Sequence, residues 1–129
     1  MKKKSVAKLK KEADKWFSRY IRQRDTDHTG YGECITCGRS YHWKEAQAGH
    51  FVSRKTNKLR YDERNVNLQC VGCNMFKSGE QYIYGKEIDQ KYGDGIAEEL
   101  MSQRNDTHKF TITELEEIIK YSKDNLKEK

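Results

Sequence analysis

Two short motifs, Cys34-Ile35-Thr36-Cys37 and Cys70-Val71-Gly72-Cys73, decide how this chain folds, and they contain all four of its cysteines. A CxxC turn presents two thiolates to one metal ion, and two such turns complete the tetrahedral site of a structural zinc. The alternatives are two disulfides or a redox-active CxxC, and neither accounts well for two matched pairs. The pattern therefore predicts a zinc ion bound by Cys34, Cys37, Cys70 and Cys73.

The composition indicates why a metal would be needed. Hydrophobic residues make up 34% and charged residues 36% of 129 residues, which predicts one domain with a small apolar core. A structural zinc contributes on the order of 10 kcal/mol to folding, against a net stability of roughly 5–15 kcal/mol. Because four sulfurs saturate the ion, it carries out no hydrolysis itself. Any chemistry must therefore lie elsewhere in the chain.

The charge balance and the hydropathy limit the class of protein. The formal net charge is +6, which is compatible with binding nucleic acid. No apolar run is long enough to span a bilayer, so we expect no membrane partner. Lys8, Lys10 and Lys11 interrupt the apolar region that a secretory signal would need. We therefore expect a cytoplasmic protein.

Helical periodicity marks both ends of the chain. Residues 5–25 are expected to form an amphipathic helix, with apolar residues at spacings of three and four: Val6, Leu9, Ala13, Trp16, Phe17, Tyr20 and Ile21. The basic side chains of this region are either solvated or contact phosphates, the candidates being Lys2, Lys3, Lys4, Lys8 and Lys11. A capping box at Thr113 and Glu116 is expected to begin a terminal helix that packs against the first.

The central region is expected to alternate short elements. We predict a strand at residues 49–53, a second short strand or a turn at 65–68, an exposed loop at 54–64, and a helix from 70 to 76. A further helix, with a capping box at Ser78 and Gln81, is expected to run to Tyr92 and to bury Tyr82 and Tyr84. A short helix capped by Asp94 follows at residues 96–103. The prediction is a mainly helical α+β domain over residues 1–129, with a basic N-terminal helix (1–30), a zinc-bound core (31–92) and C-terminal helices (93–129).

Three segments carry a resemblance to a known family. They are Ala48-Gly49-His50-Phe51, the run from Arg60 to Cys70, and Cys73-Asn74-x-x-Lys77-Ser78-Gly79. They resemble the phage lambda-type NinG, or Rap, recombination proteins, and the likeness continues in weaker form to Tyr121. That family is similar to the HNH, or His-Me finger, nucleases. The resemblance implies a zinc-stapled ββα-metal core with flanking helices, in a phage or prophage endonuclease that cuts branched DNA such as Holliday junctions and D-loops.

The resemblance also implies roles for single residues. His50 matches the general base of the HNH nucleases, and Asn65, five residues before Cys70, matches the middle asparagine that holds the imidazole. Asn74, directly after Cys73, matches a ligand of a catalytic Mg²⁺ or Mn²⁺ ion. The alternative is that His50 is a structural or zinc-binding residue and that Asn65 only forms a turn.

One position departs from the HNH pattern. Most HNH nucleases have Asp or His directly before the base, where it also binds the metal, and this chain has Gly49 there. Glu80 is a candidate replacement, and Asp62 and Glu63 are weaker ones. A neutral histidine can take a proton from water near pH 7. A hard cation held by oxygen ligands such as the Asn74 amide would stabilise the phosphate charge.

A basic segment lies between His50 and Asn65 and is either a DNA-contacting loop or a solvated one: Arg54, Lys55, Lys58, Arg60 and Arg64. No base-reading element is evident, which favours recognition of the DNA backbone or shape. Resolving a junction takes two cuts, which a homodimer would supply, although nothing in the sequence itself shows one. Two other functions stay open: a zinc-stapled DNA-binding or adaptor module without catalysis, which Gly49 favours, and an HNH nuclease acting on ordinary duplex DNA.

Overall fold

The computed structural model describes residues 4–127, and the predicted contacts of Lys2 and Lys3 lie outside that range. The helical elements are α1 (Val6–Arg24), the 3-10 turn η1 (Trp43–Glu45), α2 (Asn57–Arg60), the π-helical turn η2 (Gly72–Phe76), α3 (Gln81–Tyr92), α4 (Ile96–Ser102) and α5 (Ile112–Asp124). The strands are β1 (Tyr31–Glu33), β2 (Ser40–His42), β3 (Gln47–His50) and β4 (Val66–Gln69). Helices combined with short antiparallel strands confirm the α+β, mainly helical class.

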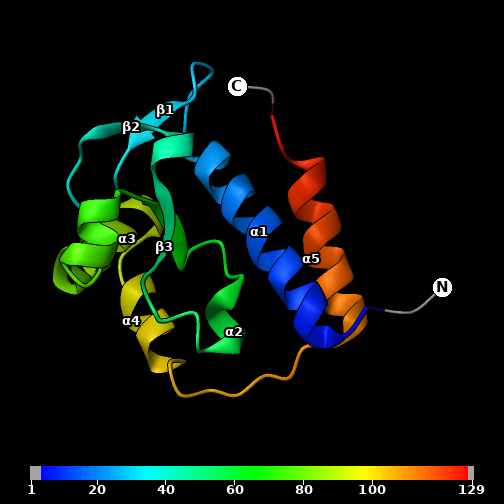
Figure 1. Ribbon diagram of the computed structural model, residues 1–129. Helices are drawn as coiled ribbons and strands as arrows, with labels where there is room; N and C mark the ends of the chain where they lie inside the picture. Colours follow the sequence, from blue (N-terminus) through cyan, green and yellow to red (C-terminus); the bar gives the residue numbers. More distant parts are fainter. Residues whose placement is uncertain (1–3, 128–129) are drawn as a thin grey trace.

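The two terminal helices lie side by side and run in the same direction (Figure 1). Ser5 caps α1 by accepting a hydrogen bond from the Lys8 amide. Leu9 and Ala13 of α1 are buried against Leu115 and Ile119 of α5, which confirms the predicted contact between the terminal helices. The opposite side of α1 faces β3, so α1 separates α5 from the central elements (Figure 1). Burying a leucine or isoleucine side chain contributes about 1.5–3 kcal/mol.

The strands form two separate antiparallel pairs. β1 pairs with β2, and β3 pairs with β4 in the register that places Gln47 opposite Gln69 and His50 opposite Val66. The two strands expected around His50 and Asn65 are therefore present, although β3 begins earlier and ends at His50. The π-helical turn η2 follows β4, where a helix was expected.

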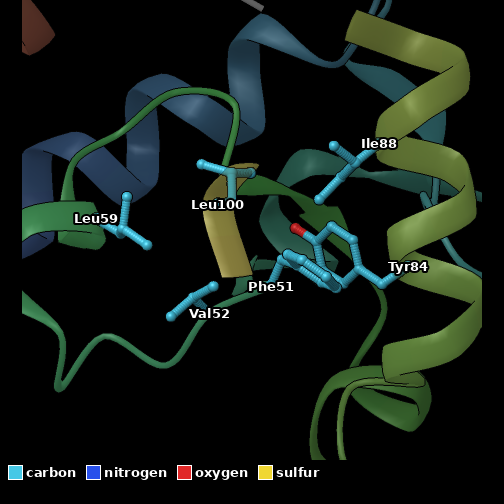
Figure 2. Close-up of a cluster of buried hydrophobic side chains, with 6 residues drawn as sticks. All are labelled: Phe51, Val52, Leu59, Tyr84, Ile88 and Leu100. Carbon is cyan, nitrogen blue, oxygen red and sulfur yellow. The ribbon is translucent and has the colours of Figure 1, made fainter. Parts of the chain in front are cut away.

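A second cluster of buried side chains lies between α2, α3 and α4 (Figure 2). The rings of Phe51 and Tyr84 lie with their centroids 5.4 Å apart. Leu59 of α2 is fully buried in this cluster together with Leu100 of α4. The prediction that residues 54–64 form an exposed loop is therefore wrong, because Leu59 anchors the segment in the core.

Three predicted helix caps are also wrong. α5 is capped by Thr111 and Glu114 instead of Thr113 and Glu116. Ser78 does not cap α3; residues 78–80 all have positive φ angles, and Glu80 precedes the helix without a side-chain capping bond. Gly95 precedes α4 in place of the expected Asp94 cap. Among residues 4–127, no helix is long and apolar enough to cross a membrane.

Candidate metal centre and active site

The four cysteines meet at the end of the β1–β2 hairpin. Cys34 and Cys37 lie in the hairpin turn, Cys70 follows β4, and Cys73 lies in η2. All four sulfur atoms lie within 4.8 Å of one another, and the sulfurs of Cys37 and Cys70 are 3.8 Å apart. Zinc–sulfur bonds of about 2.3 Å in a tetrahedron require sulfur–sulfur distances of about 3.8 Å. The arrangement therefore suits one zinc ion without rearrangement of the backbone.

Backbone hydrogen bonds hold this site in place. The amide of Cys70 donates to the sulfur of Cys34 at 3.3 Å, and the amide of Cys73 donates to the sulfur of Cys70 at 3.4 Å. The amide of Ile35 donates to the Leu68 carbonyl at 2.9 Å, which joins the hairpin to β4. The metal site is thereby connected directly to the strand pair that ends at His50.

His50 lies at the end of β3 and lines a pocket of about 340 Å³. The pocket is bounded by residues of α1, β3, α2 and η2 and of the loops on either side of α2: Asp14, Phe17, Ser18, Ala48, His50, Ser53, Arg54, Arg60, Tyr61 and Asn74. The structure thus brings together His50 and Asn74, which the sequence analysis assigned to one site. Glu80, Asp62 and Glu63, the proposed carboxylate replacements, do not line this pocket.

The imidazole of His50 is held in one orientation by the main chain. Its Nε2 atom lies 3.0 Å from the carbonyl oxygen of Arg60. A carbonyl only accepts, so Nε2 carries the proton and Nδ1 keeps its lone pair when the ring is neutral. Burial lowers the pKa of His50, and the positive charges of Arg60 and Arg54 lower it further. The ring is therefore neutral at pH 7 with Nδ1 free to accept a proton.

Asn74 is positioned from two sides. Its backbone amide donates to the Cys70 carbonyl at 2.9 Å, and its side-chain nitrogen donates to Oε1 of Gln47 at 2.7 Å. No side chain of the described residues donates to its amide oxygen. That oxygen is therefore available to a ligand, and Gln47, at the start of β3, fixes the direction in which it points. Sequence reasoning missed Gln47, whose contact depends on residues far apart in the chain.

Asn65 is fully buried, and its side chain does not hold the imidazole as predicted. Its oxygen accepts from the Val52 amide at 2.7 Å, while its nitrogen donates to the carbonyls of Val52 and Leu59 at 2.9 and 3.1 Å. Through these three bonds the side-chain oxygen and both N–H groups of Asn65 are hydrogen-bonded. They connect the residue that precedes β4 to the segment that follows His50. Asn65 therefore positions the loop from Val52 to Leu59, and the Arg60 carbonyl takes the role predicted for Asn65.

Arg60 has a different role from the DNA contact predicted for it. Its guanidinium makes a two-pronged ion pair with the carboxylate of Asp14 on α1 and donates to the Arg54 carbonyl at 2.8 Å. The hydroxyl of Tyr61 also donates to Asp14, at 2.8 Å. Partial burial alone would raise the pKa of Asp14, but the bonds from Arg60 and Tyr61 hold it below its usual value. Asp14 therefore fixes the position of Arg60, whose carbonyl oxygen accepts the hydrogen bond from His50.

The other basic residues of the segment divide into two groups. Arg64 pairs with Asp62 and Glu99, and Lys58 pairs with Asp106. Arg54 and Lys55 are exposed, and among residues 4–127 neither side chain has a charged partner within ion-pair distance. The five residues do not form one uniform basic surface, and Arg54 is the exposed cation that also lines the pocket.

The structure explains why residue 49 is glycine. A Cβ atom there would lie 2.0 Å from Oε1 of Gln69, which is itself fully buried. The side-chain nitrogen of Gln69 donates to the Gly79 carbonyl at 2.9 Å and to the hydroxyl of Thr36 at 3.1 Å. Gln69 therefore occupies the space that a carboxylate side chain at position 49 would need. Asp14, on α1, is instead the carboxylate that lines the His50 pocket.

Fold and site define a small α+β protein in which four cysteines are positioned to bind a metal ion, beside a pocket lined by a histidine and an asparagine. The chain belongs to the NinG family, because the family's sequence profile, "Bacteriophage Lambda NinG protein", matches residues 1–129. It is 36% identical over 111 residues to protein ninG of Escherichia phage lambda and 34% identical to that of Salmonella phage P22, each covering 84% of this chain. It spans about half the length of these relatives (50% and 51%). No solved structure matches the chain.

Proposed function

We propose that this chain is a metal-dependent endonuclease that hydrolyses phosphodiesters in branched DNA, such as the Holliday junctions and D-loops of phage recombination. The observation that carries the proposal is the shared pocket of His50 and Asn74 beside the cysteine site. The order of β3, β4 and η2 supports an HNH-like ββα unit, with the zinc as its scaffold.

His50 acts as the general base. Its Nε2–H is held by the Arg60 carbonyl, which leaves Nδ1 to take a proton from the attacking water. The lowered pKa keeps this nitrogen unprotonated at neutral pH. General-base catalysis of this kind contributes roughly 10²–10⁴-fold to the rate.

A divalent cation fits the remaining groups. Asn74 offers a free amide oxygen, and Mg²⁺ or Mn²⁺ accepts such an oxygen together with waters and phosphate oxygens. When bound, the cation would stabilise the negative charge that develops on the phosphate and the leaving oxygen. Because one neutral amide contributes little charge, we expect weak binding of this second metal. Arg54 lines the same pocket and is placed to contact the DNA backbone.

The rival function is a zinc-stapled DNA-binding or adaptor module without catalysis. The specific observation in its favour is that Gln69 fills the space beside Gly49, so the usual carboxylate ligand is lost. A nuclease for ordinary duplexes is the remaining alternative. A homodimer would place two sites on one junction, as two cuts require.

One cleavage assay separates these functions. Labelled four-way junctions, D-loops and linear duplexes of matched sequence are incubated with Mg²⁺, with Mn²⁺ or with no added metal. Omitting the metal, instead of adding a chelator, leaves the structural zinc in place. The proposal predicts metal-dependent cleavage of the branched substrates over the duplex. Binding without cleavage under all conditions would favour the adaptor module, and equal cleavage of duplex would favour the general nuclease.

A further inference from the structure

Exposed apolar side chains are concentrated in the segment that includes Asn74 and the start of α3. Among residues 4–127, ten large hydrophobic side chains are exposed, and five of them lie between residues 71 and 83: Val71, Met75, Phe76, Tyr82 and Ile83. Phe76 is 81% exposed and Tyr82 is 78% exposed. Single exposed apolar residues are ordinary, but a cluster of them marks a site of interaction.

Tyr82 shows that this exposure is specific to part of α3. The helical pattern predicts that both Tyr82 and Tyr84 pack inside the protein. Tyr84 does so: its ring contacts Phe51, and its hydroxyl donates to the Gly49 carbonyl at 2.5 Å. Tyr82, two residues earlier, is exposed to solvent, and the ammonium of Lys86 lies 5.2 Å from its ring centroid. The prediction for Tyr82 is therefore wrong.

The backbone under these aromatic residues is anchored to the metal centre. Phe76 ends η2, the turn that contains Cys73 and Asn74. The amide of Gly79 donates to the Cys73 carbonyl at 2.8 Å, and the carbonyl of Gly79 accepts from the buried Gln69 side chain at 2.9 Å. Phe76 is thus presented by a turn that is held at both ends, and Tyr82 follows on the first turn of α3. Because two residues span at most about 7 Å, the Phe76 backbone lies within that distance of Asn74.

The charges around the rings suit a nucleic acid. Lys77 and Lys86 are both exposed and flank the two aromatic residues, whereas Glu80 is the only acidic residue between positions 71 and 86. Aromatic side chains interleaved with lysines form the surface on which single-stranded bases stack while cations contact the backbone.

We infer that Phe76 and Tyr82 form a stacking surface for unpaired DNA bases at the branch point, beside the phosphate that enters the His50 pocket. The inference rests on the proposed function and adds the feature that selects branched DNA over duplex. A branch point offers bases whose faces are free, whereas the faces of duplex bases are already covered. The same surface could instead join two copies of this chain, and the experiment below separates the two.

The test measures binding in a His50→Ala background without added Mg²⁺ or Mn²⁺, so that no cleavage intervenes and the zinc is retained. The probes are a fluorescein-labelled four-way junction, a matched linear duplex, and the junction with 2-aminopurine at the branch point. Phe76→Ala and Tyr82→Ala should each weaken junction binding by about 5- to 150-fold, the range for one base on one aromatic ring. Duplex binding should be unchanged, and the 2-aminopurine quenching seen with the parent protein should be lost.

Two control variants accompany these. Phe76→Trp keeps an aromatic face and should retain junction affinity and quenching. Tyr31→Ala removes a tyrosine of β1 that is 48% exposed and should change neither. Junction affinity and quenching that are unchanged in both alanine variants would overturn the inference. So would equal losses on junction and duplex, or a dimer in analytical ultracentrifugation that the alanine substitutions convert to monomer. Because cleavage is not measured, failure here is distinct from failure of the proposed nuclease activity.

Discussion

Asp14 offers a sharp test of how the histidine is held. Its carboxylate forms a bidentate ion pair with the guanidinium of Arg60, and the Arg60 carbonyl accepts a hydrogen bond from Nε2 of His50. The substitution Asp14→Asn keeps the size of the side chain and removes its charge. The Arg60 guanidinium then keeps its positive charge at a site where its side chain is only 12% exposed.

The expected cost follows from this geometry. Hydrogen bonds that involve a charged group contribute about 1.5–3 kcal/mol, and the partial exposure of both partners places the Asp14–Arg60 pair within that range. We therefore expect Asp14→Asn to lower the free energy of unfolding by about 2 kcal/mol. The control Asp106→Asn breaks an ion pair to Lys58 whose side chains are 44% and 47% exposed. Such a surface pair contributes at most about 1 kcal/mol.

Urea unfolding at several pH values measures both variants. The pKa of Asp14 is lowered in the folded protein, so its stabilisation is present above the ordinary Asp value of about 4 and is lost as the pH falls through the folded pKa. The difference between the parent protein and Asp14→Asn should therefore shrink in acid.

An NMR titration of His50 provides the second readout. Asp14 raises the pKa of His50, whereas Arg60 and Arg54 lower it. Removing the Asp14 charge should therefore move the His50 pKa further down, while Asp106→Asn leaves it unchanged. A stability loss equal to that of Asp106→Asn, together with an unshifted His50 pKa, would refute the role of Asp14 in positioning Arg60 and His50.

Three further substitutions test the scaffold. Cys73→Ser, or zinc removal, should cost on the order of 10 kcal/mol and unfold the central region; a native circular dichroism spectrum after verified zinc loss would contradict this. Asn65→Ala leaves the amide and the carbonyl of Val52 without partners and should cost about 3 kcal/mol in urea unfolding; a loss under about 1 kcal/mol would argue against its positioning role. Gly49→Ala forces a Cβ atom against Gln69 and should cost about 1–3 kcal/mol, whereas Gly72→Ala, whose Cβ would meet its nearest neighbour at 3.9 Å, is the thermal-unfolding control. Equal melting temperatures for these two glycine variants would show that position 49 has room.

Local patterns predicted the parts of the fold that depend on near neighbours. The two CxxC motifs placed the four cysteines together because each pair is fixed by its own turn. The apolar spacing of Leu9, Ala13 and Phe17 identified the buried face of α1, since a helix repeats every three to four residues. The two strands around His50 were found for similar reasons.

The helix caps show where such patterns are ambiguous. Thr111-x-x-Glu114 and Thr113-x-x-Glu116 both match the capping-box sequence. The first is used because Phe110 and Leu115 are both buried against α1. Phe110 directly precedes the cap residue Thr111, and Leu115 lies four positions after it. These are the two positions that pack together in a hydrophobic staple. The burial that selects the register comes from the packing of α1 on α5.

The candidate site was predictable only in part for the same reason. His50 and Asn74 could be found from their places in the motif, and the structure brings them to one pocket. Asp14, Gln47 and Gln69 could not, because each acts on a residue distant in the sequence. Leu59 did leave a signal, as an apolar residue in a charged segment, and that signal indicates an anchor in the core.

The most direct measurement is single-turnover cleavage of a four-way junction with Mg²⁺ or Mn²⁺ by His50→Ala and by the control His28→Ala, whose histidine is exposed. The account predicts that His50→Ala binds the junction as tightly as the parent protein and cleaves it about 10²–10⁴-fold more slowly, while His28→Ala cleaves at the parent rate. Cleavage by His50→Ala at the parent rate would contradict the assignment of His50 as the base.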